Sequence, residues 1–71
     1  MTDVKSILKI LAGSKYVFRT SKGIAKEINS DDRIVKIILE EIEGLGLARK
    51  LIKEDKVLWA PTEMGLKKLR E

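Results

Sequence analysis

Few residues in this chain have side chains that could support catalysis or metal binding. The 71-residue sequence contains no cysteine and no histidine, which excludes zinc fingers and the Cys-His or Ser-His pairs of nucleophilic catalysis. The adjacent acids Asp31 and Asp32 suggest a metal site, but acids at a helix start are better explained as caps. Because no acid pair, phosphate loop or nucleophile arrangement remains, we expect no enzyme activity and no cofactor.

Positive charge is the second chemical feature, and it is concentrated in the first half of the chain. Residues 1–36 carry eight Lys and Arg against four Asp and Glu, whereas residues 37–71 carry seven of each. A basic half favours an anionic partner, and nucleic acid is the commonest one. The net charge of +4 is also ordinary for a soluble domain.

Length and composition indicate one small folded domain over residues 1–71. With 44% apolar residues the chain is expected to fold, and its core must be built from packing alone. No apolar run is long enough to span a membrane, and Lys5 and Lys9 interrupt the first apolar stretch, so we expect a cytoplasmic protein. The lack of Gln and the abundance of Ile, Lys and Glu are typical of hyperthermophile proteins and suggest an archaeal-like origin.

Apolar spacing predicts helices over about residues 3–12, 21–29 and 31–44. Thr20 or Ser21 is expected to cap the second helix, and Ser30-Asp31-Asp32 the third. Residues 15–19 are interpreted as a short strand. Because only residue 30 separates the second and third predicted helices, the two must meet at a sharp angle, which is the geometry of a helix-turn-helix.

After Gly46 the pattern changes to a hairpin, with strands over 47–53 and 57–60 and a polar tip at Glu54-Asp55-Lys56. Pro61 ends the second strand and Thr62 caps a last helix to about residue 70. That helix is expected to pack through Met64, Leu66 and Leu69. The aromatic residues Tyr16, Phe18 and Trp59 are expected in core or rim packing, not in base stacking. The predicted fold class is α+β: three helices, a two-stranded wing and a short C-terminal helix.

Three segments resemble small winged helix-turn-helix regulators of the MarR and ArsR type, common in archaea and their viruses and plasmids. The segment TSKGIAKEINS is similar to the second helix of that family, with Ala25 at the helix crossing. The segment VKIILEEIEGLGLARK is similar to the recognition helix and its exit into the wing at Gly46, and WAPTEMGLKKL to the closing strand and last helix. Small Ala25 and flexible Gly46 suit a close helix approach and a positive φ.

The resemblance implies a double-stranded DNA-binding transcription regulator whose third helix enters the major groove while the wing contacts the backbone. Asp32 and Glu40 would also face the groove. Transferred residue by residue, the implied DNA-binding positions are Ser21, Lys22, Lys26, Arg33, Lys36, Ile37, Arg49, Lys50, Lys53 and Lys56. A homodimer through the first and last helices would place two recognition helices about one DNA turn apart, and monomeric binding stays open.

The acidic third helix supports an alternative function, a protein-interaction module within a transcription, replication or chromosome assembly. Ile34 and Ile37 are expected to be partly exposed, and exposed apolar residues often mark protein contacts. Lys36 could simply pair with Glu40 on a solvated face. The wing lysines could equally keep the hairpin soluble. RNA binding is a smaller possibility.

Overall fold

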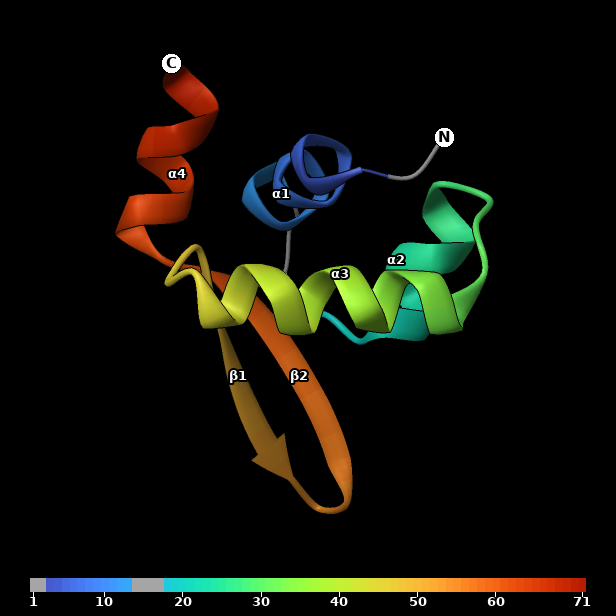
Figure 1. Ribbon diagram of the computed structural model, residues 1–71. Helices are drawn as coiled ribbons and strands as arrows, with labels where there is room; N and C mark the ends of the chain where they lie inside the picture. Colours follow the sequence, from blue (N-terminus) through green and yellow to red (C-terminus); the bar gives the residue numbers. More distant parts are fainter. Residues whose placement is uncertain (1–2, 14–17) are drawn as a thin grey trace.

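The computed structural model describes residues 3–13 and 18–71. The elements are α1 (Val4–Gly13), α2 (Ser21–Glu27), α3 (Asp32–Gly44), β1 (Ala48–Lys53), β2 (Lys56–Pro61) and α4 (Glu63–Arg70). In Figure 1, α3 runs across the middle of the molecule, with α1 above it and the β1–β2 hairpin extending below. α2 lies at the start of α3, and α4 stands beside its end. The predicted winged helix-turn-helix fold is confirmed.

Threonine and aspartate side chains cap the N-termini of three helices. Thr20, Asp31 and Thr62 are the N-caps of α2, α3 and α4, and each accepts a hydrogen bond from a backbone N–H 2.8–3.1 Å away. A cap of this kind contributes about 1 kcal/mol to stability. α2 ends at Glu27, two residues earlier than predicted, and Asn29 then takes a left-handed φ of 54°. This turn lets α3 begin at once and at a sharp angle to α2.

The hairpin closes through a two-residue turn. Lys53 lies opposite Lys56, so β2 begins one residue earlier than predicted. Glu54 and Asp55 between them have φ of 48° and 65°, the paired positive values of a type I′ turn, which matches the twist of the strands. β2 also includes Pro61 as its last residue, where a missing N–H removes no inner ladder bond.

The core lies between the helices and the base of the hairpin. Trp59 is 2% exposed, and its backbone forms two hydrogen bonds with Arg19, at 2.8 and 2.7 Å. Packing of Trp59 is therefore confirmed. Of the strand expected over residues 15–19, only Phe18 and Arg19 lie in the described residues, and Tyr16 lies outside them. The other fully buried side chains are Ile7, Leu8, Ile24, Val35, Leu39 and Ile42.

A close backbone approach holds α4 against the body. The Thr62 hydroxyl donates to the carbonyl of Gly46, whose φ of 79° needs glycine. A Cβ at Gly65 would overlap the carbonyl of Leu47. Leu69 packs against the core as expected, but Met64 is 60% exposed and is not part of the core. In the described ranges, no helix is long and apolar enough to cross a membrane.

Candidate nucleic-acid interface

The groove between α3 and the wing brings several of the predicted site residues together. It has a volume of about 380 Å³ and is lined by Ser21, Lys36, Ile37, Glu40, Val57 and Trp59. Val35, Leu39 and Ile42 turn to the core, which leaves the opposite face of α3 exposed because a helix repeats every 3.6 residues. Ile37, with 67% of its surface exposed, lies on this face.

The two basic residues of α3 that were predicted to bind DNA each lie beside an acid at the start of the same helix. The Arg33 Nε lies 3.6 Å from Asp31 Oδ1, and the Arg33 side chain is 88% exposed. The Lys36 Nζ lies 3.5 Å from Asp32 Oδ2. Exposed pairs of this kind contribute about 0–1 kcal/mol, so a phosphate or a base edge could replace either acid at little cost.

The alternative interpretation of Lys36, an ion pair one helical turn away on a solvated face, is met by Asp32 and not by Glu40, because Glu40 pairs with Lys50 of the wing. Lys50 Nζ lies 3.2 Å from Glu40 Oε1 and 5.6 Å from the centre of the Trp59 ring. Lys50 and Trp59 are register partners on the face of the hairpin that turns toward α3. The ion pair therefore links the middle of α3 to the base of the wing.

Ser21 is placed differently from the exposed lysines. Ser21 is only 7% exposed. The hydrogen bond from its hydroxyl is the main reason why the pKa of Asp32 lies below its ordinary value of 3.8. Partial desolvation of Asp32 raises this pKa, and the nearby charge of Lys36 lowers it. Ser21 thus braces the start of α3 against the start of α2.

The remaining predicted residues lie on α2 and the wing, outside the lining of this groove. Lys22 and Lys26 are exposed and line a hollow beside the turn between α2 and α3. Arg49 lies on the other face of the hairpin, 5.2 Å from the centre of the Phe18 ring. Lys53 and Lys56 lie directly opposite each other at the tip. Like charges at this spacing repel, so an anion at the tip would relieve the repulsion.

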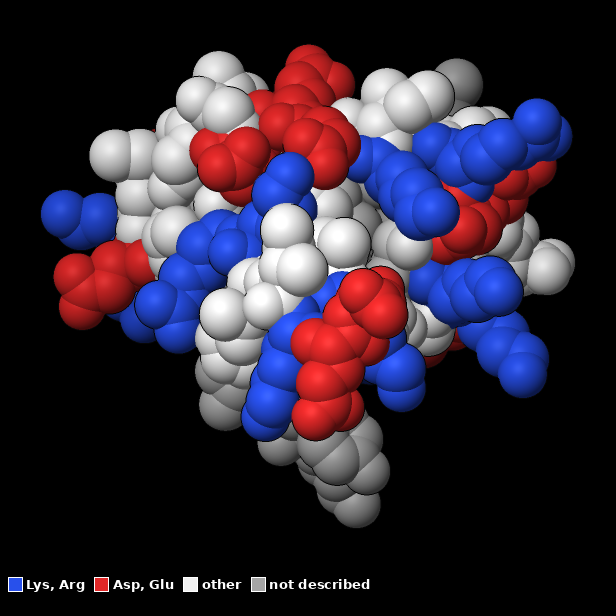
Figure 2. Space-filling view, turned by 90° about the horizontal axis from the view of Figure 1, so that it is seen from below, with Lys and Arg blue, Asp and Glu red and all other residues white. Residues whose placement is uncertain are grey.

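Figure 2 looks up at the wing and the underside of the molecule. Basic and acidic groups alternate over this face, and they form no continuous positive surface. Val57 and Trp59 also line the groove, but they were not among the site residues predicted from the sequence. The signal that could have found it is the strand alternation, which places Val57 and Trp59 on one face of β2.

The helices, hairpin wing and closing helix define a winged helix-turn-helix protein. No family model matches the sequence, and a search of curated proteins finds no match. Solved structures do match. A mutant of S. aureus MepR has a TM-score of 0.85 and 20% identity, covering 94% of this chain and 51% of its own. Lactococcus lactis ZitR, a zinc-responsive MarR family member, has a TM-score of 0.79 and 25% identity, covering 100% of this chain and 50% of its own.

A third match is Bordetella bronchiseptica BpsR, whose DNA binding is regulated by 6-hydroxynicotinic acid. It has a TM-score of 0.84 and 18% identity, and covers 99% of this chain and 51% of its own. The structure thus matches those of MarR-family winged-helix transcription regulators over nearly the whole chain, as the sequence resemblance indicated. The chain spans about half the length of these structures. In the residues described here, no acidic cluster able to hold a metal ion is found.

Proposed function

We propose that this chain is a double-stranded DNA-binding transcription regulator that places α3 in the major groove and the wing on the phosphate backbone. The observation that carries the proposal is that Arg33, Lys36 and Ile37 project from the exposed face of α3, next to a wing that carries four basic residues. The matched structures are of transcription regulators, which supports a binding role and not catalysis.

The residues of α3 divide by the groups they would meet. Arg33 suits the paired acceptors of guanine, and Lys36 suits guanine or a phosphate. Ile37 has no polar group, so its complement in the major groove is the methyl group of thymine. The exposed ion pairs to Asp31 and Asp32 would open when these cations meet the duplex.

The other basic residues would position the domain through phosphates. Such contacts carry no sequence information, but they fix the register of the helix. On α2 and the wing they are Lys22, Lys26, Arg49, Lys50, Lys53 and Lys56. Ser21 would contribute by bracing Asp32 and the start of α3, since its hydroxyl is already used inside the fold.

The test is fluorescence anisotropy with a random duplex and with the DNA upstream of the protein's own gene, at low and moderate salt. Binding should weaken steeply with salt, because each phosphate contact adds about 0.9 to the slope of log K against log salt. Arg33→Ala and Lys36→Ala should abolish the preference for upstream DNA. Lys5→Ala removes the same charge from the exposed side of α1 and should leave binding unchanged.

A second candidate is a protein-interaction module, favoured by the exposed Ile34 and Ile37 on an acidic helix. An apolar contact is insensitive to salt or strengthened by it. If neither duplex binds at low salt, the DNA proposal fails, and a protein partner of α3 becomes the leading function.

A further inference from the structure

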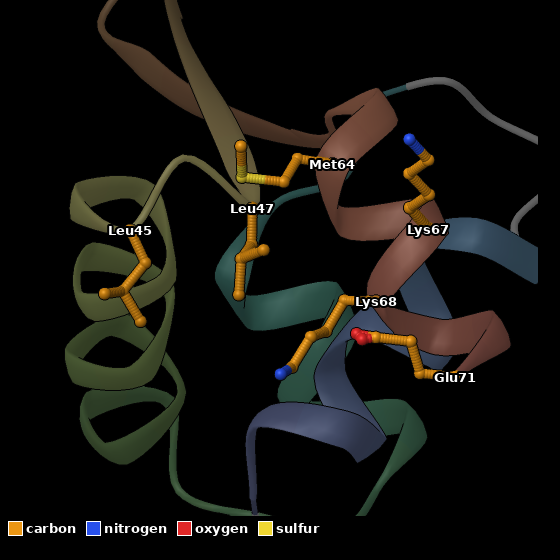
Figure 3. A pocket seen from close by; sticks show the side chains of 6 residues that line it. All are labelled: Leu45, Leu47, Met64, Lys67, Lys68 and Glu71. Atoms are coloured by element: carbon orange, nitrogen blue, oxygen red, sulfur yellow. The ribbon is translucent and has the colours of Figure 1, made fainter.

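Two hollows along α3 differ in how their charged side chains are held. The larger one, of about 560 Å³, lies between the end of α3 and α4, and Figure 3 shows Leu45, Leu47 and Met64 around it. The ion pairs found in the described part of the chain involve none of its lining residues. The groove between α3 and the wing, by contrast, contains the carboxylate of Glu40, which a basic residue of another element holds in place.

Glu40 lies on the face of α3 that is proposed to meet DNA. It follows Lys36 by four residues and Ile37 by three, so the three side chains lie on one side of the helix, and all three line the groove. The Glu40 side chain is 56% exposed. A carboxylate at this place would repel the phosphates of a duplex, so it weakens binding unless its charge is compensated.

The wing supplies the compensating charge. Lys50 Nζ lies 3.2 Å from Oε1 of Glu40 and 5.6 Å from the centre of the Trp59 ring. Trp59 is itself fixed, because it is almost fully buried and its backbone is hydrogen-bonded to that of Arg19. The Glu40 carboxylate is therefore held from a packed part of the fold before any ligand binds, which reduces the entropy that a contact with it would cost.

One oxygen of this carboxylate stays available. The hydrogen bond from Lys50 uses Oε1, and among the residues that the structure describes no donor to Oε2 is found. An ionised carboxylate can only accept hydrogen bonds. In the major groove, cytosine presents a donor, its N4 amino group, and no acceptor, whereas adenine, guanine and thymine all present acceptors. A fixed acceptor at this place therefore favours cytosine over the other three bases.

We propose that Glu40 reads a cytosine in the major groove and that Lys50 is the residue that positions its carboxylate. This inference rests on the proposed DNA binding and deepens it, because it adds a base-reading residue of negative charge to α3. It also changes the role of Lys50 from a phosphate contact to a contact within the fold. Ile37 lies about 4.5 Å nearer the helix start, so its thymine would belong to a neighbouring base pair.

The first experiment is selection of duplexes from a random library by the 71-residue chain, followed by sequencing. The wild type is expected to enrich duplexes with cytosine at one fixed position. Glu40→Gln should make cytosine the least selected base there, because the amide oxygen keeps the contact with Lys50 while the NH₂ group, a donor, faces the donor of cytosine. Glu41→Gln is the matched control. It removes the same charge from an exposed neighbour outside the groove, and it should still select the cytosine.

Lys50 is tested by base preference and not by affinity, because the loss of any phosphate-facing charge weakens binding to every duplex. Two selected duplexes that differ only by cytosine or thymine at the fixed position are compared by fluorescence anisotropy. Lys50→Ala should bring the ratio of their dissociation constants close to one, and Lys50→Arg, which still donates to Glu40, should keep the wild-type ratio. Lys53→Ala removes the same charge at the wing tip, and it should weaken binding to both duplexes without changing their ratio.

A modified base tests the contacting atom. When N4-methylcytosine pairs with guanine, its methyl group replaces the N–H that faces the major groove, and the other N–H still forms the base pair. This single change should weaken wild-type binding at least about fivefold, the lower end of what a good base contact contributes. Glu40→Gln has lost the acceptor and should show no such weakening.

The outcomes separate the two proposals. If the wild type enriches no duplex, the proposed DNA binding fails, and this inference fails with it. If duplexes are enriched without a fixed cytosine, or if Glu40→Gln selects the same cytosine as the wild type, DNA binding stands and the cytosine contact is overturned. Glu40 would then serve only to hold the wing against α3.

Discussion

At the scale of single residues, Ile37 gives the sharpest test of the proposed base recognition. It is exposed in the groove between α3 and the wing, beside Val57. Replacing thymine by deoxyuridine removes one methyl group from the major groove and leaves base pairing intact. One buried methyl contributes about 0.8 kcal/mol, so we expect about fourfold weaker binding for the critical thymine, measured by anisotropy on the best-binding duplex.

The control for this prediction is a variant pair. Ile37→Ala should bind the thymine and deoxyuridine duplexes equally well, whereas Arg33→Ala should bind both more weakly and keep their ratio. A ratio of one for the wild type at every thymine would remove Ile37 from base recognition.

Ser21 and Asp32 give a prediction on acid stability. The hydrogen bond from Ser21 lowers the pKa of Asp32 below 3.8. A group with a lowered folded pKa stabilises the fold above its ordinary pKa, and this contribution is lost as the pH falls through the folded value. Ser21→Ala should therefore raise the pKa of Asp32 and reduce the pH dependence of unfolding below about pH 4.

Carboxyl NMR titration measures this directly. The pKa of Asp3 is also lowered, chiefly by the backbone N–H of Ser6, and it should not move in the Ser21→Ala variant. An unchanged Asp32 titration would mean that Ser21 does not brace this carboxylate.

At the scale of elements, the attachment of α4 depends on Gly65. Because a Cβ there would overlap the Leu47 carbonyl, Gly65→Ala must push α4 outward. Overpacking of this kind costs about 1–3 kcal/mol, which urea unfolding would measure. Gly44→Ala is the control: its Cβ would meet nothing within 4 Å, so the variant should be neutral or slightly stabilised. Equal stability of the two variants would contradict the close approach.

The sequence predicted the elements well because apolar spacing and caps are local signals. The wing tip was misjudged because Glu54 and Asp55 adopt positive φ without the Asn or Gly that usually marks such a turn. The pairing of Glu40 with Lys50 joins two elements, and no spacing rule along one helix could predict it. Met64 was expected in the core because helical spacing alone does not show which side of a terminal helix is covered.

At the scale of the whole molecule, the net positive charge is spread and interrupted by acids. The site residues predicted from the sequence lie on α2, α3 and the wing, and none lies on α1 or α4. The acids of α3 and its cap lie in three places: Asp31 and Asp32 at the helix start, Glu40 paired with Lys50 of the wing, and Glu41 and Glu43 near the helix end.

Trp59 has a practical consequence for all these measurements. It is the only tryptophan of the chain, it is almost fully buried, and Lys50 lies over its ring while bound to Glu40. The protein thus carries its single tryptophan at the junction of α3 and the wing. Its emission should shift to longer wavelength on unfolding, and should change in intensity if a duplex draws Lys50 away from the indole, so that one unlabelled sample could report both folding and docking.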